Sequence, residues 1–172
     1  MNTFALELFD DEGAMCCFYT VRWETAGKSE TEKFFDHHAQ ISRFERPLQE
    51  LATFMAVQIG AKHGAIASYF RFENYAHALP PSGLYRVESM DINYKDFPLR
   101  LYCLRISDSI VVLFNGAEKT AGSAQGGKTS MVFHEANQFA RRLLEALRLG
   151  EIYIDSDGRT FRNNHGGLDI FI

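Results

Sequence analysis

The chain has 172 residues and a formal net charge of −4, with 46% hydrophobic and 23% charged residues. This length suits one compact domain, residues 1–172, with enough side chains to bury a core. The composition is that of an ordinary globular protein, and it does not favour nucleic-acid binding, which usually shows as a basic surface. The first 36 residues hold 3 basic and 8 acidic side chains, so the acidity is concentrated at the front.

The sequence shows no sign of membrane insertion or secretion. No apolar run approaches the roughly 20 residues that a membrane helix needs, and the N-terminus lacks the regions of a secretory signal. We therefore expect a cytoplasmic protein with no membrane partner. Cys16, Cys17 and Cys103 show no CxxC spacing, so neither a zinc site nor a disulfide framework is predicted. We expect buried reduced thiols, no metal and no cofactor.

The first elements expected in chain order are a β-hairpin and a helix. Alternating apolar residues predict strands over 3–9 and 15–23, with a polar, glycine-containing turn between them. Ser29 is followed three residues later by Glu32, the spacing of a capping box, and this predicts a helix over 29–38.

A second helix is predicted shortly after the first one. Pro47 suits its first turn, apolar residues recur at helical spacing, and either Gly60 or Gly64 ends it. A short link joins the two helices, so we expect them to pack as a helical hairpin. Residues 65–83 are aromatic and end in prolines and a glycine, and we expect irregular structure there.

Three strands and a helix form the next part of the chain. Apolar runs predict strands over 84–92, 99–106 and 109–115. The third run is apolar on both faces, which indicates a central strand covered on both sides. Apolar residues at a clean helical period then predict an amphipathic helix over 131–148, with Glu135 on its outer face.

Two short strands, over 151–155 and 168–172, close the chain. The resulting order is ββααβββαββ, in which strands joined by hairpins are separated by grouped helices. This pattern predicts an α+β domain with a mainly antiparallel sheet, an N-terminal β-hairpin, a helical hairpin and one C-terminal amphipathic helix.

The segment Gly122–Thr129 matches the phosphate-binding pattern GxxxxGK[ST]. In such a P-loop, backbone N–H groups cradle phosphates, and Lys128 would reach the terminal phosphates. A P-loop strand runs almost directly into the first glycine, whereas residues 115–121 intervene here, and only 43 residues follow Thr129. We therefore expect a connector, and nucleotide binding is the third of three functional hypotheses.

Basic and aromatic side chains on the predicted strands form the main candidate site. Arg100 and Tyr102 are two residues apart, so they share one face of a strand. An arginine grips phosphate with its planar guanidinium, and a neighbouring tyrosine or lysine can move a proton in RNA cleavage. The alternative is that the arginines pair with acids and sheet neighbours. Further candidates are Arg86, Lys95, Arg105, Lys119 after the third strand, and His134 in the first turn of the last helix.

The segment from Tyr85 to Leu147 resembles the RelE/HigB-like superfamily of bacterial type II toxins. The order of the preceding helical hairpin and the closing helix is also similar. The resemblance implies a RelE-like core over about 29–150, to which the hairpin 3–23 and a C-terminal extension, 151–172, are added. The motifs that carry it are Leu84-Tyr85-Arg86, Leu99-Arg100-Leu101-Tyr102, Ile110–Phe114 with Asn115-Gly116, and Glu118-Lys119-Thr120.

This resemblance implies a toxin that cleaves mRNA, free or on the ribosome, without a metal ion. It also implies an antitoxin partner, for which a neighbouring gene for a helix-turn-helix protein is expected. The chain is acidic, and the lysine pair usual before the threonine is Glu118-Lys119 here, which fits the second hypothesis, a non-catalytic protein-binding module on the same fold. The resemblance makes Arg100, Tyr102, Lys119 and His134 the catalytic candidates, with Tyr102 or His134 transferring a proton, and Arg86, Lys95 and Arg105 the RNA-binding candidates.

Overall fold

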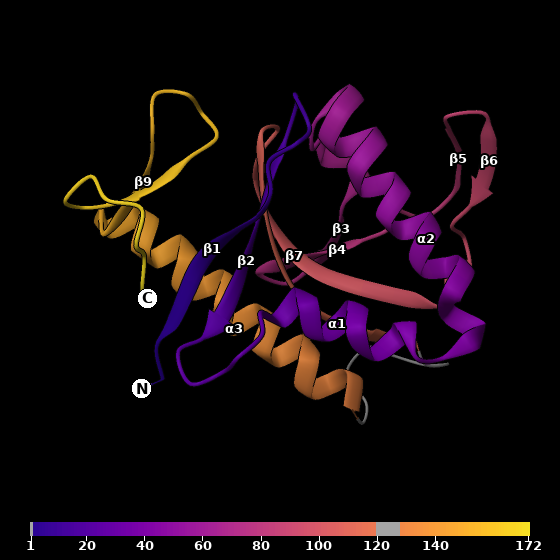
Figure 1. Cartoon of the computed structure of the whole chain (residues 1–172), viewed down its shortest axis with the longest axis horizontal. Coiled ribbons are helices and arrows are strands. Elements are labelled where there is room, and N and C mark those ends of the chain that lie inside the picture. Colours follow the sequence, from indigo (N-terminus) through magenta and orange to yellow (C-terminus); the bar gives the residue numbers. More distant parts are fainter. Residues whose placement is uncertain (1, 120–127) are drawn as a thin grey trace.

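Figure 1 shows the computed structural model of the chain, which describes residues 2–119 and 128–172. A six-stranded sheet lies at its centre, in the strand order β1-β2-β8-β7-β4-β3. All neighbouring strands are antiparallel except β2 and β8, so the predicted α+β class with a mainly antiparallel sheet is confirmed. The six strands are β1 (Phe4–Asp10), β2 (Cys17–Trp23), β3 (Arg71–Glu73), β4 (Ala76–Leu79), β7 (Leu99–Ser107) and β8 (Ile110–Glu118).

Helices cover both faces of this sheet. On one face lie α1 (Glu30–Ala39) and α2 (Glu45–Thr53), which continues into a π-helical segment, η2 (Phe54–His63). On the other face lies α3 (Lys128–Leu149), drawn in orange behind the sheet in Figure 1. Single 3-10 turns, η1 (Ser42–Phe44) and η3 (Ala67–Tyr69), precede α2 and β3.

The central strand β8 divides the core into two apolar layers. Val111 and Leu113 belong to the layer beneath α1 and α2, and Val112 and Phe114 belong to the layer beneath α3. All four side chains are fully buried. This alternation explains why the run is apolar throughout and confirms that both of its faces are covered.

Local signals placed the helical hairpin correctly. The N–H of Glu32 donates to Ser29 Oγ at 3.1 Å, and the N–H of Ser29 donates to Glu32 Oε2 at 2.7 Å, so the capping box is complete. The second helix, including η2, ends at Gly64, whose φ of +76° favours glycine.

Two predictions between the helices and β7 were wrong. Residues 65–83 are not irregular, because they contain β3 and β4, which extend the sheet from β7. Residues 84–92 are not one strand of the sheet but a separate hairpin of β5 (Leu84–Val87) and β6 (Met90–Asn93). Strands of three or four residues are too short to show a clear period. The predicted order ββααβββαββ therefore omits β3 and β4 and counts the β5–β6 hairpin as one strand.

The C-terminal segment closes the fold at the opposite edge. A short pair, β9 (Ile152–Ile154) and β10 (Phe161–Asn163), is followed by a tail that bridges to β1 through Phe171. The predicted strand 168–172 is thus only an isolated bridge, and β10 was missed. Both termini lie on this side of the molecule (Figure 1). No helix among the described residues is long and apolar enough to cross a membrane.

Candidate functional site

The structure brings three predicted site residues to one face of the sheet. Arg100 and Tyr102 both extend from β7 toward α3, as their spacing predicted, and Tyr102 belongs to the core layer beneath that helix. His134 lies on α3, in the second turn because the helix begins at Lys128. It follows Phe133, whose ring packs edge-on against that of Tyr102 with 6.0 Å between centroids.

Arg100 is held by an acid that the sequence did not reveal. Its Nη1 lies 3.1 Å from Oε1 of Glu73 on β3, and the two side chains are 20% and 14% exposed. The strand between them, β4, carries only Ala76 and Ala78 on this face, so the two long side chains reach each other across it. Solvent screens such a largely buried ion pair weakly, so Arg100 is strongly engaged.

Tyr102 is wholly buried and does not present its hydroxyl to solvent. Its Oη, like Arg100 Nε, is buried without a hydrogen-bond partner among the described residues. Burial, with the negative charge of Glu73, raises the pKa of Tyr102 to about 12. Its phenol therefore keeps its proton at neutral pH and exchanges it poorly with a ligand.

A groove of about 600 Å³ lies beside these residues, between the β3–β4 turn and α3. One wall holds Phe72, Glu73 and Asn74, and the other holds His134 and Asn137, together with Phe133. The imidazole of His134 is exposed there. Glu73 lines the groove, whereas Arg100 lies behind it, so an anion that enters meets the carboxylate first.

Asn137 fixes the turn of the β3–β4 hairpin against α3. Its Oδ1 accepts hydrogen bonds from the backbone N–H of Tyr75 at 2.7 Å and of Ala76 at 2.8 Å. The side chain is nine-tenths buried, and its Nδ2 donates to the carbonyl of Phe133 at 3.0 Å. The position of Glu73, two residues before Tyr75, therefore depends on a contact with α3.

The remaining predicted residues do not line this groove. Lys119 is exposed just after β8, and Lys95 is exposed in the turn before β7. Arg86 pairs with Asp91 on the separate β5–β6 hairpin.

Arg105 faces the opposite side of the sheet from Arg100. It donates to the carbonyl of Ala65 and pairs with Asp108. Three of the predicted arginines, Arg86, Arg100 and Arg105, thus pair with acids, as the alternative hypothesis held.

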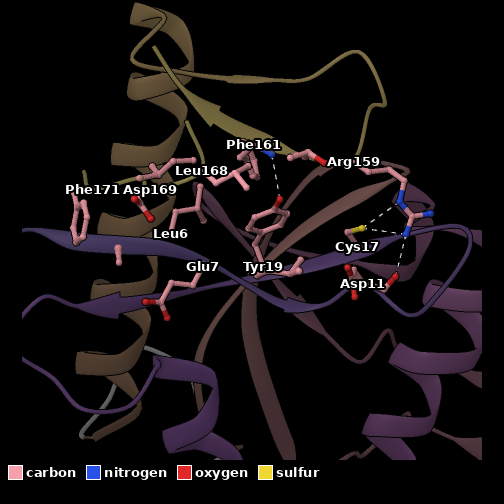
Figure 2. Close-up of a pocket in the computed structure, with 14 residues that line it drawn as sticks. Leu6, Glu7, Asp11, Cys17, Tyr19, Arg159, Phe161, Leu168, Asp169 and Phe171 are labelled. Carbon is pink, nitrogen blue, oxygen red and sulfur yellow. Dashed lines mark hydrogen bonds between the residues drawn. The ribbon is translucent and has the colours of Figure 1, made fainter. Parts of the chain in front are cut away.

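A second cavity, of about 390 Å³, lies between β1, β2 and the C-terminal segment (Figure 2). At one end, Sγ of Cys17 accepts hydrogen bonds from Nε and Nη2 of Arg159, at 3.2 and 3.0 Å. The other two cysteines lie in apolar surroundings, where burial raises the pKa of Cys16 to about 12 and that of Cys103 well above its usual value. All three are free and buried thiols, as expected, but the contact with Arg159 was not foreseen.

A pair of carboxyl groups joins α1 to α3. Glu135, predicted on the outer face of α3, is half-buried and lies near the carboxyl group of Glu30, the first residue of α1. Burial and the neighbouring Glu30 raise the pKa of Glu135 to about 7. Glu30 is buried, and its Oε2 accepts a hydrogen bond from Lys33 Nζ at 2.7 Å.

Neither a metal site nor a known relative directs the interpretation of these sites. Within 2–119 and 128–172, no group of three or more His, Cys, Asp or Glu side chains is placed to hold a metal ion. The glycine-rich part of the P-loop match, Gly122–Gly127, lies outside the described residues. The chain matches no protein-family model, no curated protein and no solved structure.

Proposed function

We propose that this chain is the toxin of a type II toxin–antitoxin pair and that it cleaves mRNA at the groove between the β3–β4 turn and α3. The observation that supports the proposal is the meeting of Arg100, Tyr102 and His134 at one face of the sheet. These three residues come from positions up to 34 residues apart in the sequence. The resemblance of the surrounding motifs to RelE/HigB-like toxins supplies the reaction.

In the proposed reaction, a ribose 2′-oxygen attacks the adjacent phosphorus and the bond to the 5′-oxygen breaks. The imidazole of His134 accepts the proton of the 2′-hydroxyl, and solvent protonates the departing 5′-oxygen. Arg100 stabilises the negative charge on the phosphorane oxygens. The products are a 2′,3′-cyclic phosphate and a 5′-hydroxyl. Tyr102 transfers no proton in this scheme, because its buried phenol does not reach the groove, and its ring packs against Phe133 of α3.

The test is induced expression of the protein, with and without the neighbouring gene, combined with RNA cleavage assays on free and ribosome-bound mRNA. We expect expression of the wild type to arrest growth. We expect Arg100→Ala and His134→Ala each to reduce RNA cleavage by about 100-fold or more. The matched controls are Arg148→Ala, at the far end of α3, and His165→Ala, in the C-terminal segment, both of which leave toxicity intact. Expression without any defect in growth or translation contradicts the proposal.

A non-catalytic protein-binding module is the second candidate, and one observation favours it. Phe72 on the groove wall is 84% exposed, beside an Arg100 side chain that already pairs with Glu73. An exposed aromatic beside a groove suits the anchor of a protein interface. Under this proposal, Phe72→Ala weakens binding of the protein encoded by the neighbouring gene. Arg100→Ala and His134→Ala leave growth unchanged.

Both proposals place the chain in the cytoplasm, where mRNA and its translation machinery are found. The exposed cations Arg86, Lys95 and Lys119 are the residues that would contact the RNA backbone outside the groove under the first proposal. Arg105 is engaged by Ala65 and Asp108 and would contribute through the stability of the fold.

A further inference from the structure

A second guanidinium group, that of Arg71, lies near the Arg100–Glu73 ion pair. Arg100 pairs with Glu73 at 3.1 Å, and burial and the positive charge of Arg100 both lower the pKa of Arg71. Arg71 itself donates from Nε to the carbonyl of Pro80 at 2.9 Å. One carboxylate against two guanidinium groups leaves a net positive charge in a place that solvent reaches poorly.

The buried donors around Arg100 are incompletely used. Arg100 Nε and Tyr102 Oη both lack a partner among residues the structure describes, although Tyr102 is 0% exposed. A buried polar atom without a partner costs about 1–3 kcal/mol, so such atoms are rare in folded proteins. A group with several acceptor oxygens would satisfy N–H groups of the Arg100 guanidinium that the two oxygens of Glu73 leave unused.

Glu73 lies on a short edge strand of the sheet, just before the turn that Asn137 holds against α3. β3 has only three residues, lies at the sheet edge and pairs with β4 alone. Asn74, directly after Glu73, has a φ of +71°, in the left-handed region, where the chain turns sharply. Elements with few packing partners open at low free-energy cost, so β3 yields more easily than the central strands β7 and β8.

We propose that Glu73 is an internal competitor for Arg100 and that a phosphate group entering the groove displaces it. The released carboxylate moves toward solvent at the groove wall, and the phosphate oxygens take its place on Arg100, with Arg71 adding a second positive charge. This exchange breaks one ion pair and forms another without a covalent step. The inference rests on the proposed function, since it describes how the same groove admits the RNA phosphate.

Inorganic phosphate is the probe for this exchange, with its affinity measured by calorimetry on the full chain. We expect Glu73→Gln to bind phosphate about tenfold more tightly than the wild type, because the competing charge is gone. Adding Arg100→Ala to Glu73→Gln abolishes the gain. The matched control is Glu145→Gln, which removes the acid from the exposed Arg148 pair on α3 and leaves phosphate affinity unchanged.

Glu73→Asp covers the case in which Glu73→Gln does not fold, since it keeps the charge but shortens the side chain. We expect its phosphate affinity to exceed that of the wild type. The inference is overturned if neither variant gains affinity, or if the gain survives the loss of Arg100. RNA cleavage separates the two proposals. If the Glu73 variants gain phosphate affinity but no variant cleaves RNA, the proposed nuclease activity is overturned. If the wild type cleaves RNA but the Glu73 variants gain no phosphate affinity, the role of Glu73 is overturned.

Discussion

The Glu30–Glu135 pair makes a sharp prediction about how stability depends on pH. In the folded protein the pKa of Glu135 is about 7, raised first by burial and then by the neighbouring Glu30 carboxyl, against an ordinary value of 4.5. An acid with a raised folded-state pKa is bound to its proton more tightly in the folded state. The contribution of the protonated Glu135 to the free energy of unfolding is therefore fully present below about pH 4.5. It is lost as the pH rises to about 7.

Glu135→Gln removes this titration while keeping a side chain of similar shape. A change of one pKa unit corresponds to about 1.4 kcal/mol, but Glu135 is only half-buried and solvent screens its charge. We therefore expect the free energy of unfolding of the wild type to fall by about 1–2 kcal/mol from pH 4.5 to pH 8 through this group. The free energy of unfolding of the variant, relative to the wild type, then rises by that amount from pH 4.5 to pH 8.

Urea unfolding at these two pH values, followed by circular dichroism, measures the difference. Glu145→Gln is the control on the same helix, because Glu145 is exposed and the hydrogen bond from Arg148 lowers its pKa. Its difference from the wild type does not rise with pH. A difference for Glu135→Gln that stays constant between pH 4.5 and pH 8 would refute the coupling of the two carboxyl groups.

Three further predictions follow from packing and from cysteine chemistry. In Gly116→Ala, the new Cβ would lie 2.0 Å from a backbone carbonyl oxygen of β7, so thermal or urea unfolding should show a loss of about 3 kcal/mol, whereas Gly27→Ala, with no atom within 4 Å, stays within about 0.5 kcal/mol. Tyr102→Phe removes a buried hydroxyl without a partner, so we expect its free energy of unfolding to lie between that of the wild type and about 1 kcal/mol above it. A clear loss of stability would reveal a partner for the hydroxyl. In native protein at pH 8, iodoacetamide followed by mass spectrometry should label Cys17 first, because Cys17 lines the cavity beside β1 and β2, whereas Cys16 and Cys103 are wholly buried. Cys16, with a pKa of about 12, also stays a thiol, and equal labelling of the three cysteines would contradict this.

Local sequence signals were sufficient for elements that carry their own start, stop and period. The capping box at Ser29 and Glu32 begins α1, one of the two candidate glycines, Gly64, ends the second helix, and the doubly apolar run of β8 marks the centre of the sheet. Each of these signals comes from residues within a few positions of one another. The α+β class followed from them, because strands and helices of this length and order bury their apolar faces in few ways.

The partners of the site residues were decided only by the tertiary structure. Glu73 lies 27 residues before Arg100, on a strand too short to show a period, so no sequence pattern reveals that it faces the guanidinium. The same holds for Tyr102, whose spacing from Arg100 predicts the shared face but not the ring of Phe133 that covers it.

The sequence by itself therefore determined which residues of β7 share a face, since alternation along a strand is a property of the backbone. Whether that face is open, neutralised or buried depends on what packs against it: β3 supplies the carboxylate, and α3 supplies the cover. Those contacts arise from chain closure over tens of residues and have no local signature. The chemistry of Arg100 is consequently set by a strand that the sequence alone did not disclose.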